Sequence, residues 1–173
     1  MRPARRKSNW RRLLHAASFA ALAGVVAAVM LADPYDCGKR TAAAGSVDAG
    51  EVKGDKVELL VTGYCNCGKC CGWRKKWFFF GVPVYDYGRM RGSPKKVGVT
   101  ASGSRAMKGT IAADPAVYPF GTKMHVPGYG AGIVQDVGGS IKGAHIDIWF
   151  PSHDEALAWG ARRVKVRVAA AKK

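Results

Sequence analysis

Residues 144–149 read AHIDIW and form the clearest strand signal in the chain. Side chains along a β-strand alternate between its two faces, so the two isoleucines share one face, and Asp147 shares the other with the flanking histidine and tryptophan. Isoleucine is apolar and β-branched, and we expect both isoleucines to face a core. The carboxyl group of Asp147 should then lie on the outer, groove side of the sheet beside an aromatic ring.

Five further runs of the same β-prone character lie on both sides of this segment, separated by Gly and Pro. They are residues 57–61 (VELLV), 110–113 (TIAA), 122–126 (TKMHV), 132–135 (GIVQ) and 164–168 (VKVRV). Six short strands in a chain of this size fit a small closed barrel better than a layered α/β sheet. The sequence therefore predicts a mainly β fold built on a six-stranded barrel.

One helix is expected between the last two strands. Ser152 is followed three residues later by Glu155, which is the pattern of a capping box. Residues 156–159 (ALAW) supply an apolar turn, and Gly160 is placed to end the helix. We interpret this helix as a structural plug over the barrel.

The N-terminal part of the chain has the pattern of an export signal. The 173 residues carry a net charge of +16, from 28 Lys and Arg against 12 Asp and Glu. Six basic residues precede an uncharged run over residues 13–32: Arg2, Arg5, Arg6, Lys7, Arg11 and Arg12. A basic cluster ahead of about 20 mostly apolar residues is typical of a signal or membrane-spanning segment. We expect residues 1–32 to remain as an uncleaved membrane anchor, with a cleaved signal peptide as the alternative.

Composition divides the rest of the chain in two. Residues 33–56 are mostly small and polar, with too few large apolar side chains to form a core, and predict a flexible linker. Residues 57–173 form the expected folded domain. The exported part remains basic, so we expect a polyanionic neighbour such as the cell wall, and export argues against nucleic acid as a partner.

Three aspartates of this domain are candidate functional residues: Asp114, Asp136 and Asp147. An aspartate at a strand end usually forms a turn with its own backbone, and Asp114, beside a proline, is the most open to that structural interpretation. Asp147 lies in mid-strand, where burial near an aromatic ring and repulsion from a second carboxylate would raise its pKa. Glycine-rich turns separate Asp136 from Asp147, so a fold-back could bring the two carboxylates together.

An ordered series of short motifs runs through the domain. The motifs are residues 100–103 (TASG), 112–115 (AADP), 119–122 (PFGT), 126–130 (VPGYG), 135–143 (QDVGGSIKG), 145–150 (HIDIWF), 159–160 (WG) and 164–166 (VKV). The series resembles the 3D domain family, which is named for three aspartates, over about residues 57–168. The order of the motifs is much more specific than any one of them.

The resemblance implies a double-psi β-barrel with one short helix. It also implies a relationship to the barrel of membrane-bound lytic transglycosylase A and to cell-wall proteins of resuscitation and spore germination. On this resemblance Asp147 would be the general acid and base of a glycan-cleaving site. Asp136 and Asp114 would shape that site and tune its charge.

The implied activity is cleavage of the β-1,4 bond between N-acetylmuramic acid and N-acetylglucosamine in the glycan strands of peptidoglycan. Asp147 would protonate the leaving oxygen and then help the muramoyl 6-hydroxyl attack, whereas simple hydrolysis would use Asp136 as a second carboxylate. Thr100, Ser102 and Trp149 are expected to bind substrate along the groove. The alternative function is a non-catalytic peptidoglycan-binding module. The expected location is an exported, membrane-anchored position facing the cell wall or periplasm, with the outer membrane as one option.

Four of the five cysteines stand together: Cys65, Cys67, Cys70 and Cys71. In an exported protein two disulfides are the default. Four thiolates within seven residues could instead bind a structural zinc ion, although most zinc sites have two well-separated halves, which makes this spacing a weak metal signal. We place disulfides first and expect no other cofactor. The dispersed histidines, His125, His145 and His153, predict no metal site.

Residues 73–98 interrupt the family pattern with a basic and aromatic insert that begins WRKKWFFF. Aromatic rings stack on sugar faces and basic groups attract the muramoyl carboxylates, which favours a wall-binding flap. A solvated hairpin whose phenylalanines pack on the barrel explains the composition equally well. The sequence leaves both interpretations open.

Overall fold

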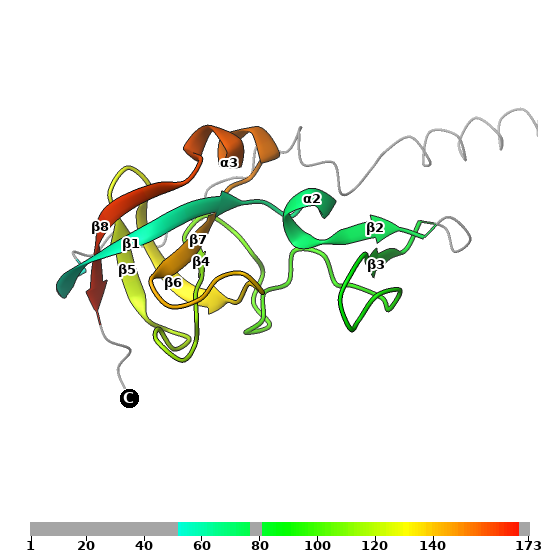
Figure 1. Cartoon of the computed structure of the whole chain (residues 1–173), viewed down its shortest axis with the longest axis horizontal. Coiled ribbons are helices and arrows are strands. Elements are labelled where there is room, and N and C mark those ends of the chain that lie inside the picture. Colours follow the sequence, from blue (N-terminus) through cyan, green and yellow to red (C-terminus); the bar gives the residue numbers. More distant parts are fainter. Residues whose placement is uncertain (1–51, 77–80, 170–173) are drawn as a thin grey trace, which may run out of the picture. The chain divides into compact units, whose positions relative to one another are not determined.

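The structure is a computed structural model that describes residues 52–76 and 81–169 (Figure 1). The predicted membrane anchor and most of the predicted linker lie outside the described residues. Within the described ranges, no helix is both long and apolar enough to cross a bilayer.

Six strands close into a barrel, and each corresponds to one of the six runs predicted from the sequence. They are β1 (Asp55–Tyr64), β4 (Thr110–Ala112), β5 (Lys123–Val126), β6 (Gly130–Asp136), β7 (His145–Trp149) and β8 (Arg162–Ala169). Around the barrel the order is β1-β7-β4-β6-β5-β8. The predicted mainly β fold with a six-stranded barrel is therefore confirmed.

The strand pairing has an internal two-fold relation. β1 runs parallel to β7 and β4 runs parallel to β6, whereas the other four neighbouring pairs are antiparallel. Exchanging β1 with β6, β4 with β7 and β5 with β8 reproduces the same set of pairings. The strand order thus has the symmetry expected of a double-psi barrel. β4 and β7, which this relation exchanges, are neighbours in the barrel.

The barrel interior holds the main hydrophobic core. Fully buried side chains, each with 0% of its surface exposed, come from every strand and include Leu59, Ile111, Met124, Ile146 and Ile148. Both isoleucines of β7 therefore face the core, as the alternation of residues 144–149 predicts. Their burial forces the intervening Asp147 to the outer face of the same strand.

The predicted helix is α3 (His153–Trp159), which lies over one end of the barrel in Figure 1. The hydroxyl of Ser152 accepts a hydrogen bond from the Glu155 backbone N–H at 3.2 Å, and Gly160 follows the last turn with a φ of 69°. Trp159 anchors the helix, because its indole N–H donates to the carbonyl of Val61 in β1 at 3.3 Å. The predicted N-cap at Ser152 and the stop at Gly160 are confirmed, and the Glu155 carboxylate accepts from the Ser152 hydroxyl at 3.0 Å.

A second helix, α2 (Gly68–Cys71), corrects the expectation of one short helix. The Cys67 side chain caps it by accepting from the Cys70 backbone N–H at 3.5 Å, and Gly72, with a φ of 59°, ends it in the left-handed conformation. Cysteine is not a usual capping residue, so the helix start carried no recognisable signal in the sequence.

The insert over residues 73–98 contains a small separate sheet made of β2 (Trp73–Lys75) and β3 (Pro83–Tyr85). In Figure 1 this hairpin extends from α2 on the side away from β5 and β8. Arg74 and Asp86 form an ion pair at 2.9 Å on its surface. The aromatic residues 77–80 lie outside the described residues, so the flap and the packed-hairpin interpretations both stay predictions.

The two isoleucines of β7 that face the core give a prediction about stability. Replacing the fully buried Ile148 with Ala should lower the free energy of unfolding by about 2–5 kcal/mol, because it removes buried methyl groups and leaves a cavity. Leu157→Ala on α3 is the matched control, since Leu157 is 64% exposed and should change stability by less than about 0.5 kcal/mol. Denaturant unfolding of the purified chain measures both, and equal losses would contradict the inward orientation of β7.

Candidate functional site

A row of four residues crosses four adjacent strands on the outer face of the barrel. Asp147 of β7 pairs with Thr62 of β1 on one side and with Ala112 of β4 on the other. Ala112 in turn pairs with Asp136 of β6, because a register shift after Ile111 brings that aspartate opposite. Residues directly opposite each other on neighbouring strands point to the same face. The two aspartates therefore flank a small alanine side chain.

Asp147 sits in a partly apolar environment. Its Oδ1 accepts a hydrogen bond from the Thr62 hydroxyl at 2.9 Å, and that hydroxyl also lies 3.0 Å from Nε2 of His145. Burial raises the pKa of Asp147 to about 6, even though the Thr62 bond lowers it, and negative charge at Cys70 and Asp136 adds to the rise. Near neutral pH this carboxyl group can exist in both protonation states, as a general acid and base requires.

Asp136 is surrounded by hydrogen-bond donors. The Tyr64 hydroxyl donates to its Oδ2 at 3.1 Å, and the backbone N–H groups of Ala101 and Val137 both donate to Oδ1 at 2.9 Å. Burial, followed by the charge of Asp136 and the hydrogen bond to it, raises the pKa of Tyr64, which keeps the phenol protonated as a donor. These donors fix the orientation of the Asp136 carboxylate within the row.

Asp114 follows the end of β4 and braces two loops. Its Oδ1 accepts from the Ala116 backbone N–H and its Oδ2 from the Gly143 backbone N–H, both at 3.1 Å. These two bonds, with the nearby Lys142 ammonium, lower the pKa of the carboxyl group. The structure thus brings Asp136 and Asp147 to one face and gives Asp114 a turn-forming position.

The three predicted substrate-binding residues occupy different environments. Thr100 is buried and bonds to the Ser104 carbonyl and to Ser102, whereas Ser102 is exposed. Their loop also presents the Ala101 N–H to Asp136. Trp149 is only 6% exposed, and its indole N–H donates to the Asn66 side chain at 2.9 Å. Substrate binding by Trp149 stays a prediction. Burial leaves little of its ring surface open to a ligand.

A second hydrophobic cluster covers this part of the outer face. Tyr64, Ala106, Ala112 and Trp149 are its buried members, and two cysteines, Cys70 and Cys71, pack against it. The cluster includes the alanine between the two aspartates and the tryptophan on the same face as Asp147. Side chains from separate segments therefore shield the carboxyl group from water, which is the physical origin of its raised pKa.

Sequence reasoning missed two polar neighbours of the aspartates, Thr62 and Tyr64, whereas it placed His145 on the same face as Asp147. Thr62 and Tyr64 lie just beyond the predicted strand 57–61, and no motif marks either of them as functional. The pairing of β1 with β7, between residues about 85 positions apart, brings Thr62 to Asp147. Alternation alone would have placed Thr62 outward, but it could not name the neighbouring strand.

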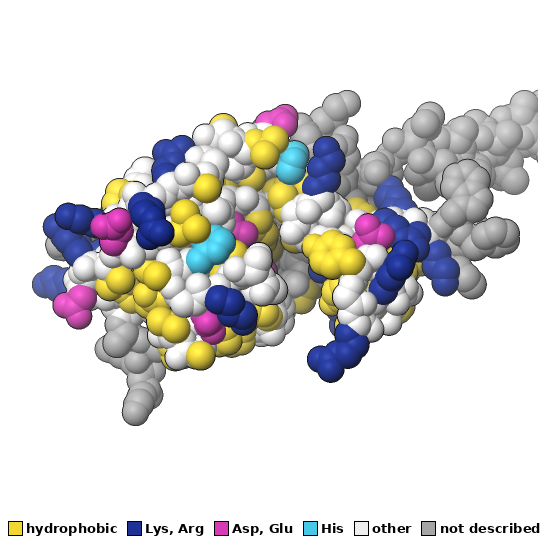
Figure 2. Space-filling view, viewed as in Figure 1, with side chains coloured by type: hydrophobic (Ala, Val, Ile, Leu, Met, Phe, Trp, Pro, Cys, Tyr) yellow, Lys and Arg dark blue, Asp and Glu magenta, His cyan; other side chains and the backbone are white. Residues whose placement is uncertain are grey.

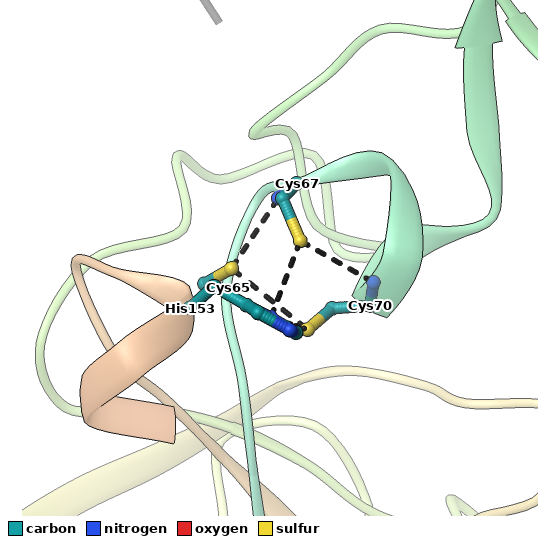
Figure 3. Close-up of side chains that lie close together, drawn as sticks. All are labelled: Cys65, Cys67, Cys70 and His153. Carbon is teal, nitrogen blue, oxygen red and sulfur yellow. Dashed lines mark hydrogen bonds between the residues drawn. The ribbon is translucent and has the colours of Figure 1, made fainter. Parts of the chain in front are cut away.

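The cysteine cluster lies at the end of β1, beside this site (Figure 3). Among its four members, all of which are described, the structure joins none in a disulfide. It gathers Cys65, Cys67 and Cys70 with His153 at the start of α3. The Cys71 thiol instead donates to the Cys65 carbonyl at 3.1 Å, and burial raises its pKa to about 12. His153, which the sequence gave no reason to group with the cysteines, is thus their neighbour.

The fold and site define a small closed barrel that carries a pair of aspartates on its outer face. Residues 109–170 match the family model of the 3D domain. The resemblance to the 3D domain family predicted from the ordered motifs is therefore confirmed over these residues.

Two Bacillus subtilis proteins are similar to this chain. The putative cell wall shaping protein YabE is 48% identical over 58 residues, which cover 34% of this chain and 14% of that protein. The cell wall-binding protein YocH is 45% identical over 75 residues, which cover 41% of this chain and 26% of that protein. The chain spans about a quarter or less of the length of these relatives.

Solved structures of the Escherichia coli protein MltA are also similar. The complex with bound chitohexaose matches at 22% identity over 47% of this chain and 30% of that chain, with a TM-score of 0.34. A second MltA structure matches at 23% identity over 46% of this chain and 30% of that chain, with a TM-score of 0.35.

The raised pKa of Asp147 predicts a pH-dependent effect of Asp147→Asn on stability. The folded state holds the proton more tightly than the unfolded chain, so the wild type loses stability as the pH rises from about 4 through about 6. The uncharged variant should be more stable than the wild type at pH 7.5 by on the order of 1–3 kcal/mol, a difference that disappears near pH 4.

Denaturant unfolding at a series of pH values measures this difference. Asp136→Asn is the control, because its carboxylate accepts three hydrogen bonds and its neutralisation should give no gain at pH 7.5. A pH-independent effect of Asp147→Asn would contradict the raised pKa.

Proposed function

We propose that this chain binds peptidoglycan and cleaves O-glycosyl bonds in its glycan strands, with Asp147 as the general acid and base. One observation carries the proposal: a partly buried carboxyl group with a pKa of about 6, held by the Thr62 hydroxyl, beside a second aspartate on the same face. The 3D domain and the cell-wall names of the two Bacillus relatives support the substrate class.

Lytic transglycosylation fits a single carboxyl group that changes protonation state. Protonated Asp147 donates its proton to the glycosidic oxygen as the bond from that oxygen to the muramoyl C1 breaks. The resulting carboxylate then takes the proton of the muramoyl 6-hydroxyl while its oxygen bonds to C1. The products are a 1,6-anhydro end and a free 4-hydroxyl, and Asp147 regains its proton.

Hydrolysis is the alternative reaction, because Asp136 supplies a second carboxylate. Only β4 lies between β7 and β6, so the two aspartates share one face with a single strand between them. Inverting glycosidases keep their two carboxyl groups about 6.5–9.5 Å apart to admit a water molecule. Asp136 would then activate that water, and its orientation is fixed by Tyr64 and two backbone N–H groups.

The basic surface supports an anionic polymer as partner. Figure 2 shows Lys and Arg side chains over both the barrel and the hairpin region, with acidic groups among them, and the whole chain has 28 Lys and Arg against 12 Asp and Glu. Muramoyl lactate and peptide carboxylates give peptidoglycan the complementary charge. We extend the proposal to location: an exported protein, held by residues 1–32 in a membrane and facing the cell wall or periplasm.

A non-catalytic peptidoglycan-binding module is the second candidate. The similarity to a protein named for cell wall binding favours it, as does the small size of the barrel region. This candidate keeps the outer-face row and the basic surface but assigns the two aspartates to sugar binding. It predicts retention of glycan without release of fragments.

Digestion of purified sacculi by the full-length chain separates the two candidates. Mass analysis should detect anhydro-muropeptides if the chain is a transglycosylase, or reducing ends if it hydrolyses the bond. Asp147→Asn should lower product release by about 10²–10⁴-fold, because the proton donor is lost. Asp154→Asn, on the exposed side of α3, is the matched control and should keep full activity.

Sedimentation of the chain with sacculi completes the comparison. Binding with no released fragments in the wild type would contradict the enzyme proposal and favour the binding module. Neither binding nor release would contradict both candidates.

A further inference from the structure

Four potential metal ligands from two distant segments converge beside the candidate site. Three cysteines come from the loop after β1 and from α2, and a histidine comes from the first position of α3. Figure 3 shows their sulfur and nitrogen atoms directed toward one another. All four ligand atoms lie within 4.8 Å of one another, and at least 83 positions separate the histidine from the cysteines it contacts.

The distances between these atoms match the edges of a tetrahedral zinc site. Zn–S bonds of about 2.3 Å and Zn–N bonds of about 2.05 Å at tetrahedral angles give an S···S edge of about 3.8 Å and an S···N edge of about 3.6 Å. The Sγ atoms of Cys65 and Cys70 are 3.8 Å apart. Nδ1 of His153 lies 3.6 Å from the Cys67 sulfur and 3.3 Å from the Cys70 sulfur.

Two backbone N–H groups donate to cysteine sulfurs in this cluster, which favours the thiolate form. The Cys67 N–H points to the Cys65 sulfur and the Cys70 N–H points to the Cys67 sulfur, each at 3.5 Å. Hydrogen bonds from N–H groups stabilise negative charge on sulfur and orient the ligands around a metal. The turn formed by the sequence Cys-x-Cys-x-x-Cys is therefore arranged for ligand binding before any ion arrives.

The histidine distinguishes a metal site from a disulfide. A disulfide between Cys65 and Cys70 would use two of the three sulfurs and would leave His153 and Cys67 without a common role. Three sulfurs and one imidazole complete a four-coordinate set, and this soft, tetrahedral S₃N combination selects zinc over magnesium, calcium or manganese. We propose that one structural zinc ion is bound by four side chains: Cys65, Cys67, Cys70 and His153.

The ion would fix the candidate site through Asn66, which lies between two of the ligands. The Asn66 side chain accepts from the Trp149 indole at 2.9 Å, and its backbone carbonyl accepts from the Trp73 indole at 2.8 Å. Trp149 lies two residues after Asp147 on the same strand. A zinc ion bound there would hold α3, the insert and the side chains that cover the aspartates in fixed positions relative to one another. The proposal concerns metal content and does not depend on cleavage of glycans.

Metal analysis of the purified full-length chain tests the proposal. Inductively coupled plasma mass spectrometry should find one zinc per chain, and all five cysteines should titrate as thiols after denaturation. His153→Ala should transfer its zinc to a chromogenic chelator at least tenfold faster than the wild type. His153→Cys should restore slow transfer, because it supplies a fourth sulfur ligand.

Cys71→Ser is the matched control, since that thiol neighbours the cluster in sequence but points to the Cys65 carbonyl, and it should retain one zinc. Cobalt substitution of the wild type gives a readout that does not depend on variant folding. Thiolate-to-cobalt charge transfer and strong visible bands of tetrahedral cobalt are expected. A metal-free chain with a disulfide, or zinc transfer unchanged in His153→Ala, would overturn the proposal.

Discussion

The pairing of β7 between β1 and β4 is the constraint on which the rest of the structure depends. Burial of Ile146 and Ile148 inside the barrel fixes the facing of every residue in β7, because successive side chains of a strand alternate. A slip of one residue would exchange the isoleucines with Asp147, which would place a carboxyl group in the core and two isoleucines in water. The packing of two apolar side chains thus determines where the candidate acid lies.

The chemistry of Asp147 comes from what covers the outer face at that point. A carboxyl group on an uncovered strand would be well solvated and would keep an ordinary pKa. Here Tyr64, Trp149 and the cysteine segment form a second apolar cluster around the aspartates. Asn66 links the proposed zinc site to the insert through Trp73 and to the aspartate site through Trp149. The fold of the cysteine segment therefore affects how well Asp147 is shielded from water.

Much of the fold could be predicted because its signals are local. Each barrel strand carries its own run of β-prone residues, and the capping box of α3 lies within four residues. The α2 helix was missed because a cysteine caps it, and cysteine rarely signals a helix start. Thr62 and His153 were missed because their contacts come from residues more than 80 positions away. No pattern within either segment specifies such neighbours.

The sequence by itself determined the barrel class, the outward position of Asp147 and the resemblance to the 3D domain, because alternation and an ordered series of motifs are properties of the linear chain. Only the tertiary structure decided which of the three aspartates come together and which groups surround them. In the structure, Asp136 lies two strands from Asp147, and Asp114 forms a turn with the Ala116 backbone. His153 lies beside three cysteines. The physical reason is that register and barrel closure join segments whose separation in the chain carries no information about their contact.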